Sequence, residues 1–280
     1  MVQEKSSDEN QPASVSVAGP APLNEEEIQL QDQQLRQIEN EQKKVPLVGE
    51  KIPFTTLLSE YDVANAETFL SKATELAEVY EHMRYIRGDG NCFYRAVLAG
   101  LFDIWLQDRP RLQQYIGIAK AWPEELKRLG FPDWTCTDFC EFFVDFLVDV
   151  EAGAKDEETL WEHLNADSCA NYLVMFFRLI TSAFLKKNAD AYAPFIDDGL
   201  TVAQYCENEV EPMWKDADHL AVAGLVQALD TRIRIEYMDR TVAPNGGWHY
   251  DIPNFAEGQG PEITLLYRPG HYDLIYKKQE

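Results

Sequence analysis

Most apolar residues of this chain recur at helical spacing. From about residue 45 to residue 229, apolar positions return every three or four residues, as they do in amphipathic helices. Polar and turn-forming residues divide this pattern into segments. The segments predict helices over 61–85, 93–107, 111–129, 136–150, 156–187 (two helices) and 201–229.

The pattern changes near residue 231, where apolar and polar side chains begin to alternate. Ile233, Ile235 and Tyr237 alternate with charged neighbours, which is typical of a half-buried strand. Pro269-Gly270 is a turn pair between two further strand-like runs. Three strands are therefore predicted, over 231–239, 262–269 and 271–277. A glycine- and proline-rich loop separates the first two.

Many helices followed by a few strands indicate an α+β domain, with helices packed around a small C-terminal sheet. We expect this domain to span 45–280. Residues 1–22 are rich in Ser, Pro, Ala and acidic side chains, and we expect them to be disordered. Residues 23–44 have helix signals, since Asn24 and Glu27 form a capping-box pattern. Their few apolar positions leave two interpretations open: a solvated helical tail, or an arm that orders on a partner.

The charge and cysteine content narrow the possible partners and compartment. The formal net charge is −23, which argues against nucleic acid and against an anionic membrane surface. No secretory signal is visible, and the most apolar window, 171–187, contains Arg178 and is short for a bilayer span. The five cysteines are odd in number and scattered, unlike a disulfide framework. We therefore expect a cytoplasmic protein, with the nucleus as a further possible location.

One cysteine stands where a nucleophile would be placed. In "RGDGNCFYRAV" (87–97), Cys92 lies between a glycine-flanked turn and the start of a predicted helix. A helix N-terminus favours the thiolate, which is the attacking form of cysteine. Gly88 and Gly90 allow close backbone approach, and N–H groups in such a turn can stabilise an oxyanion. The alternative, a phosphate-binding loop, lacks the longer glycine pattern and the Lys-Ser/Thr pair.

A thiolate needs a base, and one of the five histidines is best placed. His82, His163 and His219 are in positions typical of surface or capping residues, and His249 falls in the glycine-rich loop. His271 begins the last predicted strand, and Asp273 follows two residues later. Side chains at i and i+2 lie on the same face of a strand, so Asp273 could orient the His271 ring.

A zinc site is the main competing interpretation of the cysteines. Cys136 and Cys140 are one helical turn apart, but no second Cys or His pair has suitable spacing. The neighbouring phenylalanines favour buried thiols instead. The sequence therefore predicts no metal site and no cofactor.

The two motifs together resemble a known enzyme family. "GDGNCFYRA" (88–96) resembles the cysteine box of the ovarian-tumour (OTU) deubiquitinating cysteine proteases, and "YRPGHYDLIY" (267–276) resembles their histidine box. The similarity extends from about residue 45 to the C-terminus. Within this class the chain looks like an otubain, and the N-terminal arm favours the longer, otubain-1-like type.

The resemblance implies a papain-like thiol isopeptidase that removes ubiquitin from conjugates and polyubiquitin chains, with preference for the proteasome-targeting linkage. Cys92 would be the nucleophile, His271 the general base and Asp273 the orienting residue. Asp89 would match a family position counted with the catalytic residues, where it shapes the loop and supports the oxyanion hole rather than transferring a proton. Gly90 and Asn91 would belong to the oxyanion turn. Trp248 and Tyr250 are predicted walls of the groove for the ubiquitin C-terminus, unless they belong to an ordinary surface loop.

Two other functions remain open at this stage. The resemblance also implies binding to ubiquitin-conjugating enzymes, through the arm and the catalytic domain, and this could restrain ubiquitin transfer without catalysis. Action on a different ubiquitin-like protein or another amide is the third hypothesis. Ubiquitin, polyubiquitin and conjugating enzymes are thus the expected partners.

Overall fold

The computed structural model describes residues 44–154, 156–196, 199–240, 248–256 and 258–278. These residues belong to one compact unit, Gln42–Glu280. The predicted disordered tail (1–22) and the predicted arm (23–44) lie outside the described residues, apart from Lys44. The beginning of the predicted glycine-rich loop, 241–247, also lies outside them.

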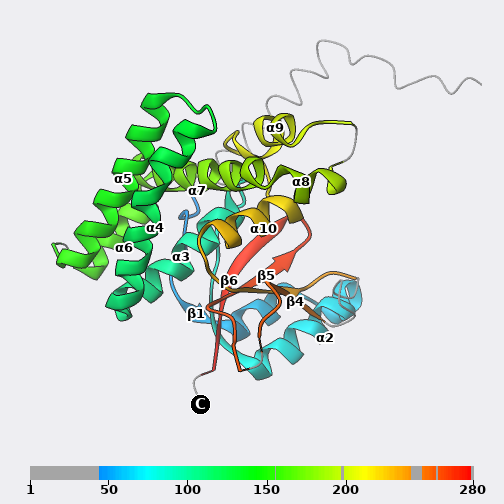
Figure 1. Ribbon diagram of the computed structural model, residues 1–280. Helices are drawn as coiled ribbons and strands as arrows, with labels where there is room; N and C mark the ends of the chain where they lie inside the picture. The colour runs from blue at the N-terminus through cyan, green and yellow to red at the C-terminus, as the bar shows by residue number, and fades with distance from the viewer. Residues whose placement is uncertain (1–43, 155, 197–198, 241–247, 257, 279–280) are drawn as a thin grey trace, which may run out of the picture. The chain divides into compact units, whose positions relative to one another are not determined.

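Helices make up most of the unit (Figure 1). The α-helices are α2 Val63–Val79, α3 Cys92–Gln107, α4 Arg109–Arg128, α5 Asp133–Ala152, α6 Glu157–Asn165, α7 Asp167–Lys187, α8 Ala189–Tyr192, α9 Val202–Tyr205 and α10 His219–Ala228. Shorter segments are the 3₁₀ turns Phe54–Glu60 and Ala193–Phe195 and the π-helical turn Cys206–Val210. The predicted pair of helices in 156–187 is confirmed as α6 and α7.

Local sequence explains several helix ends. Asp108 and Asp218 are N-caps whose carboxylates accept hydrogen bonds from the first free N–H groups of α4 and α10. Gly153 ends α5 in the left-handed conformation, with φ +62°. These capping residues mark where one helix ends or the next begins, which the spacing of apolar residues alone does not show.

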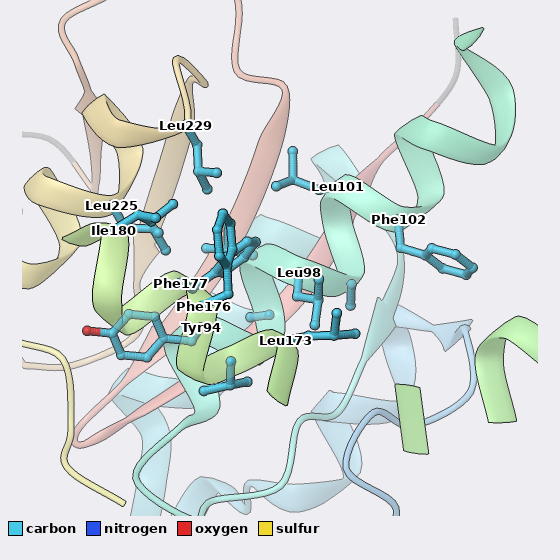
Figure 2. Packing of buried hydrophobic residues seen from close by; sticks show 14 of the residues in the cluster. Tyr94, Leu98, Leu101, Phe102, Leu173, Phe176, Phe177, Ile180, Leu225 and Leu229 are labelled. Atoms are coloured by element: carbon cyan, nitrogen blue, oxygen red, sulfur yellow. The ribbon is translucent and has the colours of Figure 1, made fainter. Parts of the chain in front are cut away.

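Helix α3 is the centre of the main core. Every residue from Cys92 to Phe102 is buried, because α3 lies between the sheet and helices α4 and α7. Figure 2 shows side chains of α3, such as Tyr94 and Leu98, packed with Phe177 of α7 and Leu225 of α10. This burial fixes the first turn of α3, where Cys92 lies.

The sheet has six strands in the order β1-β2-β6-β5-β3-β4. They are β1 Ile52–Pro53, β2 Tyr80–Arg84, β3 Ile233–Tyr237, β4 His249–Ile252, β5 Ile263–Arg268 and β6 His271–Lys277. The β3–β5 pair is parallel and all other pairs are antiparallel. The three predicted strands are confirmed as β3, β5 and β6, with β5 and β6 joined at Pro269-Gly270.

The sheet is not purely C-terminal, which corrects the prediction. The expected helix over 61–85 ends at Val79, and Tyr80–Arg84 forms β2 between β1 and β6. Tyr80 and Met83 of β2 are buried. The segment Tyr80–Arg84 looks helical in the sequence because it is largely polar and directly follows α2. Pairing with β6 decides its conformation. His82 therefore lies on a strand, and β4 similarly forms inside the predicted loop by pairing with β3.

The expected helix over 201–229 is also interrupted. Only α9 and α10 are α-helical there, and a π-helical turn and a loop at 211–218 separate them. This interruption matters because the loop borders the site.

Helix α7 is long and apolar enough to cross a bilayer by length and composition. In this structure 72% of its apolar window is buried inside the protein, where it packs against α3, α5 and α10. It is a core helix of this unit.

Candidate active site

The Cys92 turn has the conformation that the glycines suggested. Gly90 has φ +74°, and a Cβ built on it would lie 2.3 Å from the backbone oxygen of Trp214. Only glycine fits such a position without displacing backbone atoms. Cys92 follows as the first residue of α3 and is 3% exposed. The helix dipole at this position favours negative charge on the sulfur.

His271 and Asp273 stand on the same face of β6, as predicted. The His271 Nε2 lies 3.0 Å from Asp273 Oδ1. Asp273 is fully buried, and its Oδ1 also accepts a hydrogen bond from the Ile86 backbone N–H at 3.0 Å. Arg268 donates to Asp273 Oδ2 at 2.6 Å. These donors hold the carboxylate rigidly behind the imidazole.

The electrostatics of the pair favour an ionised site. Burial lowers the pKa of His271, but hydrogen bonds to Asp273 and to Cys92 outweigh it and raise this pKa to about 9. Burial raises the pKa of Asp273, yet the hydrogen bond from His271 and the charge of Arg268 bring it below its usual value. His271 is thus protonated and Asp273 ionised near neutral pH.

Cys92, His271 and Asp273 are therefore brought together in one site. The position of a Cβ on Gly88 would lie 3.5 Å from His271 Nδ1, so the glycine turn packs directly against the imidazole. The ring uses Nε2 for Asp273, and its interaction with Cys92 contributes to the raised pKa of His271. A thiol, an imidazole and a carboxylate in this order can perform nucleophilic acyl transfer.

Asp89 and Asn91 turn their side chains away from the cysteine and into the protein. Asp89 Oδ1 accepts a hydrogen bond from the Asn91 N–H at 3.0 Å, and Asp89 Oδ2 pairs with buried Arg95 at 2.8 Å. Asn91 is fully buried, and its Oδ1 accepts hydrogen bonds from Arg178. These contacts are of the loop-shaping kind expected for Asp89.

A cavity of about 420 Å³ opens beside Cys92. Its lining comes from three places: the loop and helix start at 216–219, the strand ends around Tyr237 and Tyr267, and the β5–β6 turn. Tyr237, Tyr267 and Tyr272 form a row in which neighbouring ring centres are 5.1 Å apart. Three aspartates, at 216, 218 and 239, give the lining an acidic character.

Trp248 and Tyr250 are not among the residues that line this cavity, and their place in a groove for the ubiquitin C-terminus stays a prediction. Trp248 borders a separate cavity of about 220 Å³, where Lys72 lies over its ring at 4.4 Å. Tyr250 is on β4, pairs in register with Ile235 and packs against the core. Tyr250 belongs to β4, whose pairing with β3 is not predictable from the glycine-rich sequence around it.

Several residues around the site were not expected from the sequence. His219 is exposed at the start of α10, in agreement with the expected surface or capping position, and it also lines the Cys92 cavity. Arg268 lies within the histidine box, but its contact with Asp273 has no signal in the sequence. Arg178 interrupts the apolar window 171–187, and this interruption is the sequence signal of a buried charge.

Cys136 and Cys140 are buried on α5, 0% and 1% exposed. Burial raises the pKa of both thiols, to about 12 for Cys140. Within the described parts of the chain, no group of three or more His, Cys, Asp or Glu residues could hold a metal ion.

Comparison with known proteins agrees with this geometry. The chain matches the Peptidase C65 Otubain family over residues 40–277. It is 63% identical over 261 residues to the "Ubiquitin thioesterase otubain-like" protein of Caenorhabditis elegans, covering 93% of this chain and 92% of that protein. It is 37% identical over 232 residues to the Homo sapiens "Ubiquitin thioesterase OTUB1", covering 83% of each.

Solved structures give the same result for the fold. A complex described as ceOTUB1, ubiquitin aldehyde and UBC13~Ub contains a chain 64% identical to this one, with a TM-score of 0.85. The match covers 89% of this chain and all of that one. A complex of h/ceOTUB1 with ubiquitin aldehyde and UBCH5B~Ub matches at 59% identity and a TM-score of 0.82, over 90% and 100% of the two chains.

The fold and the site define a papain-like cysteine peptidase of α+β architecture. The chain belongs to the otubain family, whose curated relatives carry the name ubiquitin thioesterase.

Proposed function

We propose that this protein is a deubiquitinating isopeptidase, which cleaves the bond between the C-terminal glycine of ubiquitin and a lysine amine. The observation that carries the proposal is the Cys92–His271–Asp273 group at the edge of an open cavity. The names of the relatives supply the substrate class. The acidic lining suits a basic peptide tail.

The reaction proceeds through a thioester. The Cys92 thiolate attacks the glycine carbonyl and forms an S–C bond, and negative charge develops on the carbonyl oxygen. The C–N bond then breaks, and the lysine amine leaves with the proton of His271. Water, deprotonated by His271, attacks the thioester, so the carboxylate of ubiquitin leaves and the thiolate returns.

The turn before α3 provides donors for the oxyanion. The N–H of Asp89 bonds to the Arg87 carbonyl and the N–H of Asn91 to the Asp89 side chain, so both are engaged within the turn. We assign the oxyanion to the N–H groups of Cys92 and Gly90. Removal of one such donor from a serine protease lowers kcat by about 10²–10³.

We further propose a preference for the proteasome-targeting ubiquitin linkage and a cytoplasmic location. The linkage preference rests on the family resemblance. Di-ubiquitins of each linkage, incubated with wild-type protein and with Cys92→Ala, test both the activity and the preference. Cleavage of one linkage well above the others, absent in Cys92→Ala, is expected. Equal cleavage of all linkages would contradict the preference, and no cleavage would contradict the activity.

A second function is proposed alongside the first: binding of ubiquitin-conjugating enzymes to restrain ubiquitin transfer. The relevant observation is that the solved relatives are complexes with UBC13 and UBCH5B carrying ubiquitin. Cys92→Ala separates the two functions, because it removes cleavage but leaves the surface intact. The variant is expected to slow ubiquitin transfer by a conjugating enzyme as wild type does. Loss of that effect in folded Cys92→Ala would contradict this function.

A further inference from the structure

A buried arginine donates hydrogen bonds to the turn that precedes Cys92. Arg178, in the middle of α7, is fully buried. Its Nε and Nη2 donate to Asn91 Oδ1 at 3.1 and 2.7 Å, and Nη2 also donates to the Gly90 carbonyl at 2.9 Å. One guanidinium therefore contacts both residues that precede the nucleophile.

The same guanidinium also contacts the segment that leads to the cavity wall. Arg178 Nη1 donates to the Val210 carbonyl at 2.9 Å, and Nη2 donates to the Lys215 carbonyl at 2.6 Å. Its plane lies over the Tyr94 ring at 4.3 Å. Arg178 thus joins the Cys92 turn to the loop at 211–218, which carries the acidic cavity lining.

These two segments also touch each other directly. The Trp214 N–H donates to Asn91 Oδ1 at 3.3 Å, and the Trp214 backbone occupies the space beside Gly90. Trp214 itself has φ +68°, a strained conformation for a residue with a large side chain. Asn91 Oδ1 thus accepts hydrogen bonds from both Arg178 and the Trp214 N–H, and it joins the two segments.

Packing alone does not require a charged group at this position. Burial of a guanidinium is costly, and replacement of buried ions by apolar side chains of similar volume is often neutral or stabilising. The four acceptors of Arg178 are neutral oxygens: one side-chain amide and three backbone carbonyls. Two of them belong to Gly90 and Asn91, directly before Cys92, and the other two belong to Val210 and Lys215.

The peptide unit between Gly90 and Asn91 shows how this works. Its carbonyl is held by Arg178 and its N–H by Asp89, on opposite edges of one planar group. With this plane fixed at both edges, the N–H groups on either side of it have little rotational freedom. The adjoining N–H groups belong to Gly90 and Cys92, the two donors assigned to the oxyanion.

We propose that Arg178 is a positioning residue for the oxyanion donors of Gly90 and Cys92, acting through the Gly90–Asn91 peptide plane and the Asn91 side chain. The proposal rests on the thioester mechanism above. It deepens that mechanism by identifying what makes the oxyanion turn rigid. Arg178 does not touch the substrate.

The test separates positioning from general stability. Arg178→Met keeps the side-chain volume and removes the donors, and Leu160→Ala on α6 is a control for lost core packing, since Leu160 is buried away from the site. Hydrolysis of a fluorogenic ubiquitin C-terminal amide gives kcat and KM. The rate of Cys92 alkylation by iodoacetamide measures the reactivity of the thiolate alone, because this reaction forms no oxyanion. Asn91→Ala repeats the test if Arg178→Met does not fold.

Folded Arg178→Met is expected to lose about 10- to 100-fold in kcat with KM within about threefold of wild type, as expected for an interaction made in the transition state. Alkylation of Cys92 is expected within about twofold of wild type. Arg178→Lys keeps the charge but has fewer donors. Its kcat is expected to lie between those of wild type and Arg178→Met. Leu160→Ala should keep the wild-type kcat below its unfolding temperature.

A folded Arg178→Met protein with wild-type kcat would overturn the proposal. A parallel loss of kcat and of the Cys92 alkylation rate in Arg178→Met would also overturn it, because that result indicates a less reactive thiolate rather than misplaced oxyanion donors. If the wild-type protein itself does not turn over the ubiquitin amide, the proposed function fails instead, and the result does not depend on Arg178.

Discussion

Three residues carry the chemistry, and their neighbours give them their properties. The pKa of His271 depends on Asp273, and Asp273 depends on Arg268 and the Ile86 N–H. The nucleophile depends on a glycine that accepts φ +74° against a neighbouring backbone. Substitutions beside the triad should therefore affect it by distinct physical routes.

Gly90→Ala should disrupt the site more than an ordinary glycine substitution. The left-handed conformation alone costs a residue with a side chain roughly 1–2 kcal/mol. Here a Cβ would also overlap the Trp214 backbone, so the turn must move. We expect a larger loss of unfolding free energy than that, with loss of ubiquitin cleavage, measured by urea unfolding and turnover.

Gly153→Ala is the matched control for this substitution. Gly153 has φ +62° but nothing within 4 Å of its Cβ position, so only the conformational cost applies. Its activity should equal that of wild type. Equal stability losses in both variants, with activity retained in Gly90→Ala, would contradict the role of the close approach.

The raised pKa of His271 predicts that stability falls with rising pH. The folded protein holds a proton on His271 up to about pH 9, whereas the unfolded chain releases it near 6.5. This contribution is complete below pH 6.5 and is lost as the pH rises through 9. It amounts to about 3 kcal/mol. Urea unfolding of wild type and His271→Gln between pH 6 and about 10 should show a smaller pH dependence in the variant; identical curves would contradict this assignment.

At the scale of elements, periodicity and turn chemistry predicted much of the fold. The strand around Ile233 alternates clearly, and Pro269-Gly270 marks the turn between the two strand-like runs that follow, so β3, β5 and β6 could be predicted. β2 could not, because its polar sequence becomes a strand through pairing with β6, which is nearly 200 residues away in the chain. The hydrogen bond of Arg178 to Gly90 was likewise invisible, because it depends on how α7 packs.

The start of α10 gives a prediction at this scale. Asp218 Oδ1 accepts hydrogen bonds from the Leu220 and Ala221 N–H groups, both at 3.0 Å, and from the Tyr205 hydroxyl at 2.5 Å. Asp218→Ala should lower the unfolding free energy by about 1–2 kcal/mol. Asp218→Asn keeps an acceptor oxygen and should lose less. Equal losses in the two variants, measured by urea unfolding, would contradict the capping role.

At the scale of the whole molecule, the site combines residues from distant parts of the chain. Cys92 begins a core helix, His271 begins the last strand, and the loop at 211–218 borders the cavity between them. The two sequence motifs allowed the first two to be predicted. The cavity wall could not be, since Asp216 and His219 carry no motif and reach the site only through the break between α9 and α10.

The most direct measurement of the central claim uses ubiquitin that carries an electrophile at its C-terminus. After incubation, intact mass and peptide mapping locate the covalent bond. The account predicts a single adduct on Cys92, abolished by Cys92→Ala and slowed by His271→Ala. An adduct on another cysteine, or none on folded protein, would contradict the assignment of Cys92 as the nucleophile.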